Sequence, residues 1–152
     1  MSKKILATLF IFAVCTGVFL FINAQPISVN SRLQGTAYAG DQEIETNIRI
    51  SFSGELHDDL FRGSKYVGDL TITSENYPVT FEDITFRFGK KGNARLPLVL
   101  DGKEFGTLIA SKNFESVCIE ITDEKYGDGE TLYLAAPATN VGQAVEVVKK
   151  LG

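Results

Sequence analysis

Short runs in which apolar and polar residues alternate constrain this chain more than any other feature of its sequence. The clearest run is EIETNIRISFSG, where polar residues separate Ile44, Ile48, Ile50 and Phe52. Side chains of a strand alternate between its two faces, so this pattern indicates a strand with one buried face. Similar runs follow at short intervals: YVGDLTIT, VTFEDITFRF, ARLPLVL, EFGTLIA, SVCIEIT and TLYLAA.

Glycine-rich segments of a few residues separate these runs, which predicts tight turns. The pair Asp101 and Gly102 is typical of a two-residue hairpin, because both residues tolerate a positive φ. Connections this short leave no room for crossover helices, so a parallel sheet is not expected. We therefore expect a β-rich (α+β) domain, an antiparallel meander that curls into a sandwich or a small barrel.

Two of the runs contain signs of local irregularity. In VTFEDITFRF the parity of the apolar residues changes after Phe81, which predicts a β-bulge at Glu82–Asp83. Pro97 interrupts ARLPLVL and has no N–H to give to a neighbouring strand. That run is therefore expected at an edge of the sheet or at the end of a strand.

The last residues of the chain follow a helical period instead. Apolar residues recur at three- and four-residue spacing in NVGQAVEVVKKL, which predicts an amphipathic helix over residues 140–151. Asn140 is suited to the N-cap, with Gln143 three residues later. Lys149 and Lys150 lie in the last turn, where they complement the helix dipole.

An uncharged apolar run, Ile5 to Ile22, follows Lys3 and Lys4. Its flanks and length fit residues 1–24 as either a signal peptide cleaved after Ala24 or an uncleaved N-terminal membrane anchor. In both cases the lysines stay inside and the rest of the chain is exported. Cys15 lies in the middle of the run, which excludes a lipoprotein attachment site there.

Residues 25–43 look like a spacer, with a short strand around Ile27 to Leu33 as an alternative, and residues 44–152 are predicted to form the exported domain. Without Lys3 and Lys4 the chain has 13 basic and 19 acidic residues, a formal charge of about −6. Such an acidic domain is a poor candidate for binding nucleic acid, whose phosphates require lysine and arginine. Cys118 is the only cysteine outside the apolar run, so no disulfide is expected within the domain.

Two acidic segments are the candidate metal or catalytic sites. GELHDDL contains the single histidine, His57, beside Asp58 and Asp59. Adjacent residues do not converge on one ion, so we expect a solvent-exposed turn there instead of a metal site. Its expected apolar anchors are Leu56, Leu60 and Phe61. DEKYGDGE offers carboxylates without the spacing of an EF-hand, and a long acidic hairpin loop is the simpler interpretation. Its potential ligands are Asp123, Asp128 and Glu130.

Enzyme motifs are missing from the sequence: it has no nucleophile elbow, P-loop or C-x-x-C. We therefore predict no catalytic residue and no cofactor. The segments LFRGSKYVGDLTI and LAAPATNVGQAVEVVKKL, behind a short apolar N-terminus, resemble small uncharacterised exported proteins of Gram-positive bacteria. That resemblance implies a location at the cell envelope and no particular activity.

The function expected from the sequence is a non-catalytic module that acts at the cell envelope through contacts with a protein or a ligand. Two alternatives stay open: an exported hydrolase that uses acidic residues, and a small barrel that binds an apolar ligand. The three differ in what they need: an exposed apolar patch, a cleft with converging carboxylates, or an enclosed apolar cavity.

Overall fold

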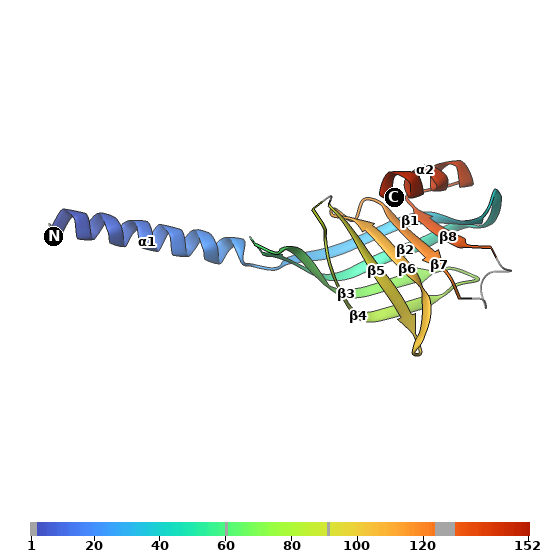
Figure 1. Ribbon diagram of the computed structural model, residues 1–152, viewed down its shortest axis with the longest axis horizontal. Coiled ribbons are helices and arrows are strands. Elements are labelled where there is room, and N and C mark those ends of the chain that lie inside the picture. The colour runs from blue at the N-terminus through green and yellow to red at the C-terminus, as the bar shows by residue number, and fades with distance from the viewer. Residues whose placement is uncertain (1–2, 60, 91, 124–129) are drawn as a thin grey trace.

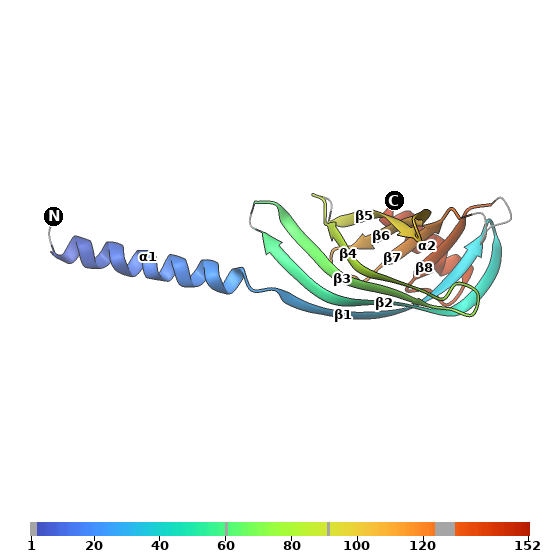
Figure 2. The same cartoon turned by 90° about the horizontal axis from the view of Figure 1, so that it is seen from below.

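The computed structural model describes residues 3–59, 61–90, 92–123 and 130–152. An N-terminal helix stands apart from a β domain of eight strands, and a second helix packs against that domain (Figures 1 and 2). The elements are α1 (Lys3–Asn23), β1 (Ile27–Ala39), β2 (Gln42–Asp59), β3 (Gly63–Thr73), β4 (Val79–Arg87), β5 (Asn93–Leu100), β6 (Lys103–Ser111), β7 (Val117–Ile121), β8 (Leu132–Ala136) and α2 (Val141–Leu151).

All eight strands belong to one antiparallel sheet in the order β4-β3-β2-β1-β8-β7-β6-β5. The sheet curls until its two edge strands, β4 and β5, approach each other, so the domain is a nearly closed barrel (Figure 2). The prediction of a β-rich domain with a C-terminal helix is confirmed at this level. β5, which contains Pro97, lies at an edge, as its proline predicted.

Residues 25–43, expected as a spacer with a short strand around Ile27 to Leu33 as the alternative, contain the longer strand β1, which pairs with β2 from Ile27 to Ala39 and with β8 over Thr36–Ala39. Its second half hides the alternation that identifies a strand. Residues 35–38 are all buried, since the barrel core covers one face and α2 covers the other. A strand buried on both faces does not show alternating polarity.

The predicted bulge and hairpin are both present. Gly68 pairs with Ile84 and Leu70 pairs with Phe81, so two residues of β4 lie opposite Asp69 alone. One of them, Asp83, has a φ of 52° and donates its N–H to the Asp69 carboxylate at 2.9 Å. Asp101 and Gly102 have φ values of 51° and 76°, and they form the two-residue turn between β5 and β6.

A pair of glycines permits the tight curvature of β2 against β3. Gly54 and Gly68 are partners in the register of the two strands. A Cβ atom on Gly68 would lie 2.4 Å from the Ser53 carbonyl oxygen and 2.6 Å from the Gly54 Cα, distances that no side chain tolerates. The close approach of these backbones is therefore available only to glycine.

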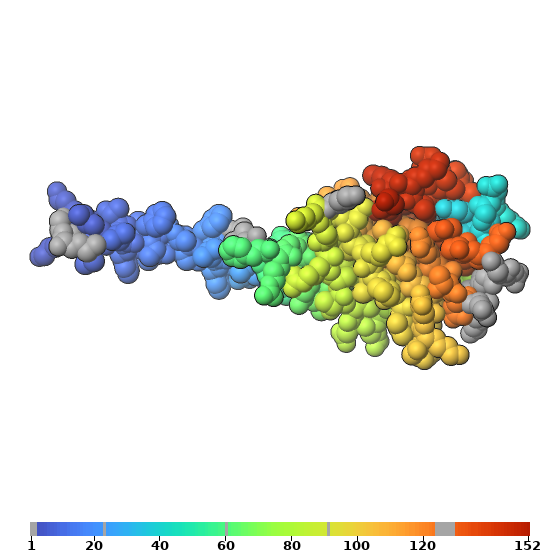
Figure 3. All heavy atoms as spheres, in the orientation of Figure 1, coloured from blue at the N-terminus to red at the C-terminus, as the bar shows by residue number. Residues whose placement is uncertain are grey.

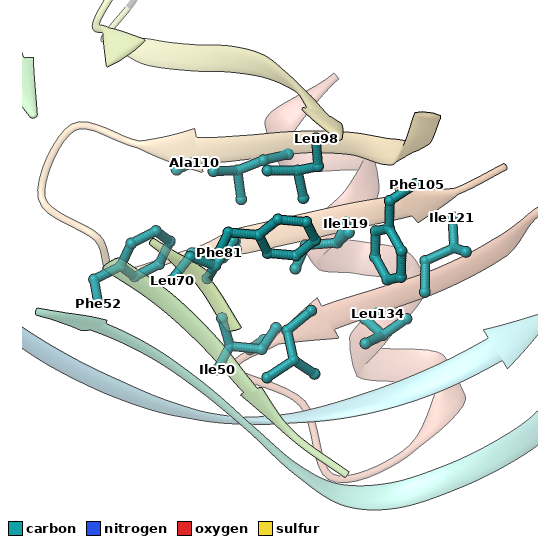
Figure 4. Packing of buried hydrophobic residues seen from close by; sticks show 14 of the residues in the cluster. Ile50, Phe52, Leu70, Phe81, Leu98, Phe105, Ala110, Ile119, Ile121 and Leu134 are labelled. Carbon is teal, nitrogen blue, oxygen red and sulfur yellow. The ribbon is translucent and has the colours of Figure 1, made fainter. Parts of the chain in front are cut away.

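Apolar side chains fill the interior of the barrel. Residues from most strands point toward one another there, and they include Ile50, Leu70, Phe81, Leu98, Phe105, Ile119 and Leu134 (Figure 4). Near one end, Phe114 from the β6–β7 turn is 4% exposed and packs among four aromatic rings, with centroids 4.9–6.3 Å away. These rings belong to Phe52, Tyr66, Phe86 and Phe88.

The second helix covers the outside of the sheet. Ala144 is fully buried and Leu151 is 6% exposed, against outward-facing residues of β1, β6, β7 and β8. Asn140 is its N-cap, as predicted, and its side chain accepts a hydrogen bond from the Gln143 N–H at 3.0 Å. The Gln143 side chain in turn accepts the N–H of Thr139 at 2.9 Å.

The first helix does not pack against the barrel. The side chains of residues 3–22 are exposed, and α1 extends from the barrel as a bare rod (Figure 3). Lys3–Ile22 is long and apolar enough to cross a membrane, since 20 residues at 1.5 Å each give about 30 Å. Only Ala24, Gln25 and Pro26 separate α1 from β1.

Candidate functional site

The histidine segment lies on a strand, which corrects the prediction of a turn. His57 and Asp58 are the two residues before Asp59, the last residue of β2. The His57 side chain is 43% exposed and its Nε2 lies 3.3 Å from a carboxylate oxygen of Glu55. The apolar anchor predicted from this segment is also wrong in part, because Phe61 is 95% exposed. Leu60 lies outside the described residues.

Both aspartates of this segment serve the hairpin that follows. Asp59 accepts the N–H groups of Phe61 and Arg62 at 2.9 and 3.2 Å, and those hydrogen bonds hold the pKa of its carboxyl below the usual range. Asp58 accepts a hydrogen bond from the Ser64 hydroxyl. Neither carboxylate is oriented toward a shared ion, so the group has the chemistry of a stabilised turn.

The second acidic segment lies at the other end of the barrel. Asp123 follows β7 and Glu130 precedes β8. β7 ends and β8 begins on the side of the barrel remote from α1, whereas β2, which carries His57 close to its last residue, ends near α1 (Figure 1). Asp128 lies outside the described residues. Within the described part of the chain, no three histidine, cysteine or acidic side chains gather closely enough to hold a metal ion.

A recess of about 520 Å³ beside the β3–β4 connection is lined by polar residues, Glu45 among them. The Glu45 carboxylate accepts hydrogen bonds from the Ser74 hydroxyl (2.7 Å), the Glu75 N–H (2.8 Å) and the Asn76 side chain (2.9 Å). Partial burial raises the pKa of Glu45, but these hydrogen bonds outweigh it and the pKa is lowered. The carboxylate is thus committed to holding the turn.

Two other titratable groups are buried between the sheet and α2. Burial raises the pKa of Cys118 to about 12, and the thiol is fully covered. Burial also raises the pKa of Tyr38 to about 12, and its ring stacks on Tyr133 with centroids 5.3 Å apart. A protonated, covered thiol is a poor nucleophile, so this region serves the packing of α2.

The open seam between β4 and β5 is the candidate binding site. The two strands approach where the chain passes from β4 to β5, and there the Gly89 N–H donates to the Asn93 carbonyl at 3.0 Å. Beyond that connection, no ladder joins β4 to β5 in the described part of the chain. Their facing edges therefore keep backbone groups that no neighbouring strand pairs.

A hollow of about 320 Å³ lies in this seam. Its floor is apolar, because Phe81 and Leu98 are 5% and 1% exposed. Its rim carries Val99, which is 57% exposed, and the half-buried Ile84. The other lining residues are Thr80, Glu82, Thr85, Leu96, Pro97 and Leu100.

The seam could be anticipated only in part from the sequence. The bulge in β4 and Pro97 in β5 each mark a strand that does not pair on both sides. That the two edges face each other depends on the curl of the whole sheet, to which distant positions such as Gly54 and Gly68 contribute.

Comparison with known proteins gives no relative: no protein-family model, curated protein or solved structure matches the chain.

Proposed function

We propose that the protein is a non-catalytic binding module, held at the outer face of a cell membrane by α1, whose β4–β5 seam receives an extended apolar segment of a partner protein. The observation that carries the proposal is the hollow of about 320 Å³ between two unpaired strand edges. Strand edges are a common docking place for extended peptides, since main-chain groups supply affinity and pockets read alternate side chains.

The lining of the seam supports a peptide over the other ligands considered. Leu96, Leu98 and Leu100 recur at every second position, which matches the spacing of side chains in an extended segment. Pro97 cannot donate a hydrogen bond, so β4 is the strand along which such a segment would pair. Glu82 is the one carboxylate among the described lining residues, whereas a hydrolase would require at least two converging groups.

A carrier of an apolar ligand receives less support from the interior of the barrel. The space that such a ligand would occupy holds large side chains, including Phe52, Phe105 and Phe114. The seam hollow lies at the lower limit of the usual volume of small-molecule sites, about 300–1,000 Å³. A groove that accepts one or two side chains fits this size better.

The end of α1 supports the anchor over cleavage. The helix runs through Asn23, and the N–H of Ala24 donates to the Leu20 carbonyl at 3.0 Å. The peptide bond after Ala24, where cleavage would occur, therefore follows directly on helical backbone. Proteases prefer exposed, extended segments, so this bond is a poor substrate. N-terminal sequencing of the mature protein tests this: Met1 or Ser2 first supports an anchor, and Gln25 first would show cleavage.

The seam is tested by selecting short linear peptides from a display library on the full-length protein in lipid nanodiscs. We expect the enriched peptides to carry apolar residues at alternate positions. Val99→Glu should weaken their binding by about tenfold or more, since about 1.4 kcal/mol corresponds to tenfold. The matched control is Ile44→Glu, because Ile44 is an exposed apolar residue (39%) outside the seam lining.

Two results would count against the seam. Enriched peptides that respond equally to Val99→Glu and Ile44→Glu would place their binding elsewhere. Binding of a fluorescent fatty acid, with no peptide enriched, would favour the apolar-ligand alternative.

A further inference from the structure

The tip of the β2–β3 hairpin exposes an aromatic side chain that the fold of the domain does not explain. Phe61 is 95% exposed, compared with 57% for Val99 and 53% for Ile27, the next apolar residues of the β domain. A fully exposed phenylalanine is unusual on a protein surface in water and is typical of a contact with an apolar medium.

Hydrogen bonds to the Asp59 side chain fix the backbone at Phe61 and Arg62. The Asp59 carboxylate accepts the N–H groups of both Phe61 and Arg62, and Gly63 takes a φ of 76° to begin β3. The side chain of Phe61 is thus presented outward by a hydrogen-bonded turn. A fixed presentation lowers the entropy that is lost when such a side chain is buried in a partner phase.

The register of the strands brings the tip level with the end of α1. Ile27, the first residue of β1, pairs with Leu56, and β2 continues for three residues past this pair toward α1. Those three steps cover about 10 Å. Four Cα–Cα steps join Asn23, the end of α1, to Ile27 and span at most about 14 Å, so the tip, which continues past Asp59, reaches back close to the level where α1 ends. Figures 1 and 2 both show the hairpin at the α1 end of the barrel.

Basic side chains surround the tip. Arg62 is exposed in the turn, Lys65 pairs in register with Arg87, and Lys90 lies in the adjacent β4–β5 turn. The N–H of Phe88 donates to the Ser64 carbonyl at 3.0 Å, which ties the two turns together. The carboxylates nearest in the chain to the tip, those of Asp58 and Asp59, are engaged in hydrogen bonds within the hairpin, and the next one, Glu55, lies 3.3 Å from the His57 Nε2.

We propose that the β2–β3 tip is a second membrane contact, in which Phe61 inserts into the interfacial layer of the bilayer that α1 spans while Arg62 and its basic neighbours meet lipid phosphates. Aromatic residues favour this layer, and basic residues are attracted to its anionic lipids. The contact would fix the orientation of the barrel on the membrane, with the β4–β5 hollow turned away from it. This inference rests on the anchor in the proposed function and is independent of what the seam binds.

The chain contains no tryptophan, so Phe61→Trp introduces a single fluorescent reporter at the tip. The full-length variant is reconstituted in vesicles of zwitterionic and anionic lipids, with quencher-labelled lipids at known depths, and mass spectrometry verifies that α1 is intact. We expect a blue-shifted emission and quenching that is strongest from labels near the headgroups. The control is Ile44→Trp, an exposed position (39%) outside the seam near the start of β2, for which we expect red-shifted emission and several-fold weaker quenching.

The inference would be overturned if Phe61→Trp, in protein that stays with the vesicles, showed the emission and quenching of Ile44→Trp. Failure of the anchor itself appears differently, as cleavage after Ala24 in cells, and the reconstituted full-length chain still decides the position of the tip. Arg62→Glu is then added to Phe61→Trp. If this second change removes the strong headgroup quenching in vesicles that contain anionic lipids, and not in zwitterionic vesicles, the basic residues contribute to the contact.

Discussion

The packing of Phe114 can be tested by comparing one substitution at a buried and at an exposed phenylalanine. The ring of Phe114 is 4% exposed and lies within 6.3 Å, centroid to centroid, of four other aromatic rings. Replacing a buried phenylalanine by alanine costs about 3–5 kcal/mol, from the lost transfer free energy and the cavity that remains. Phe61→Ala removes the same atoms from a side chain that is 95% exposed.

We expect Phe114→Ala to lower the free energy of unfolding by about 3–4 kcal/mol. The positive φ of this residue, 55°, favours the lower part of the range, because the strained turn can relax once the ring is gone. Phe61→Ala should change it by less than about 0.5 kcal/mol. Urea unfolding of the detergent-solubilised full-length protein, followed by circular dichroism, measures both free energies, and the dependence on urea concentration should have the same slope in both variants.

The same variant tests whether the barrel interior is filled as described. Phe114→Ala should create an apolar cavity that binds small apolar probes, and the wild-type protein should bind them less. A loss of stability below about 1 kcal/mol in Phe114→Ala, or equal losses in the two variants, would refute the packing described for this end of the barrel.

Three further predictions concern single positions. Glu45→Gln should lower the free energy of unfolding by about 1–2 kcal/mol, because it weakens the hydrogen bonds from the β3–β4 turn. The pKa of Glu45 is lowered in the folded protein, so the extra stability of the wild-type protein should be complete above the ordinary pKa of 4.5 and should be lost as the pH falls through the folded pKa. Unfolding measured over a series of acidic pH values checks this. Gly68→Ala should destabilise the domain by about 1–3 kcal/mol in the same urea assay, since its Cβ would overlap the Ser53 carbonyl, and an unchanged midpoint would contradict this. His57→Ala should change stability by less than about 0.5 kcal/mol, and a larger loss, or loss of a stoichiometric metal, would restore the histidine as a site.

The parts of the fold that the sequence predicts well are those set by local chemistry. The turn at Asp101 and Gly102, the bulge at Asp83 and the cap at Asn140 each depend on a few adjacent residues whose preferred backbone angles or hydrogen bonds decide the structure. Strand β2 is recognised because one of its faces is buried and the other is exposed.

The parts that the sequence does not reveal depend on contacts between distant segments. β1 is hidden because α2, about 100 residues later, buries its outer face around Tyr38. Phe61 was expected to anchor a turn, since apolar residues are usually buried, and only the register of β1, β2 and β3 places it beyond the sheet. The open seam depends on the curl of all eight strands, for which no short motif exists.

The proposed membrane contact and the proposed binding seam lie toward opposite ends of the barrel. β4 ends and β5 begins near α1, so the two strands are tied together at the α1 end of the barrel. The hollow is lined by residues of β4 between Thr80 and Thr85, Asp83 excepted, and by Leu96–Leu100 of β5, which extend away from that connection. A barrel held at the membrane by α1 and by Phe61 would therefore present its open seam to partners on the far side. If the tip were released from the bilayer, the three residues between α1 and β1 would let the barrel tilt. Peptides selected on the seam should bind Phe61→Asp protein in detergent with the same affinity as the wild-type protein. In nanodiscs, where the lipid surface lies beside the barrel, their binding to Phe61→Asp should differ from their binding to the wild-type protein. Comparing the two conditions separates the orientation of the barrel from recognition by the seam.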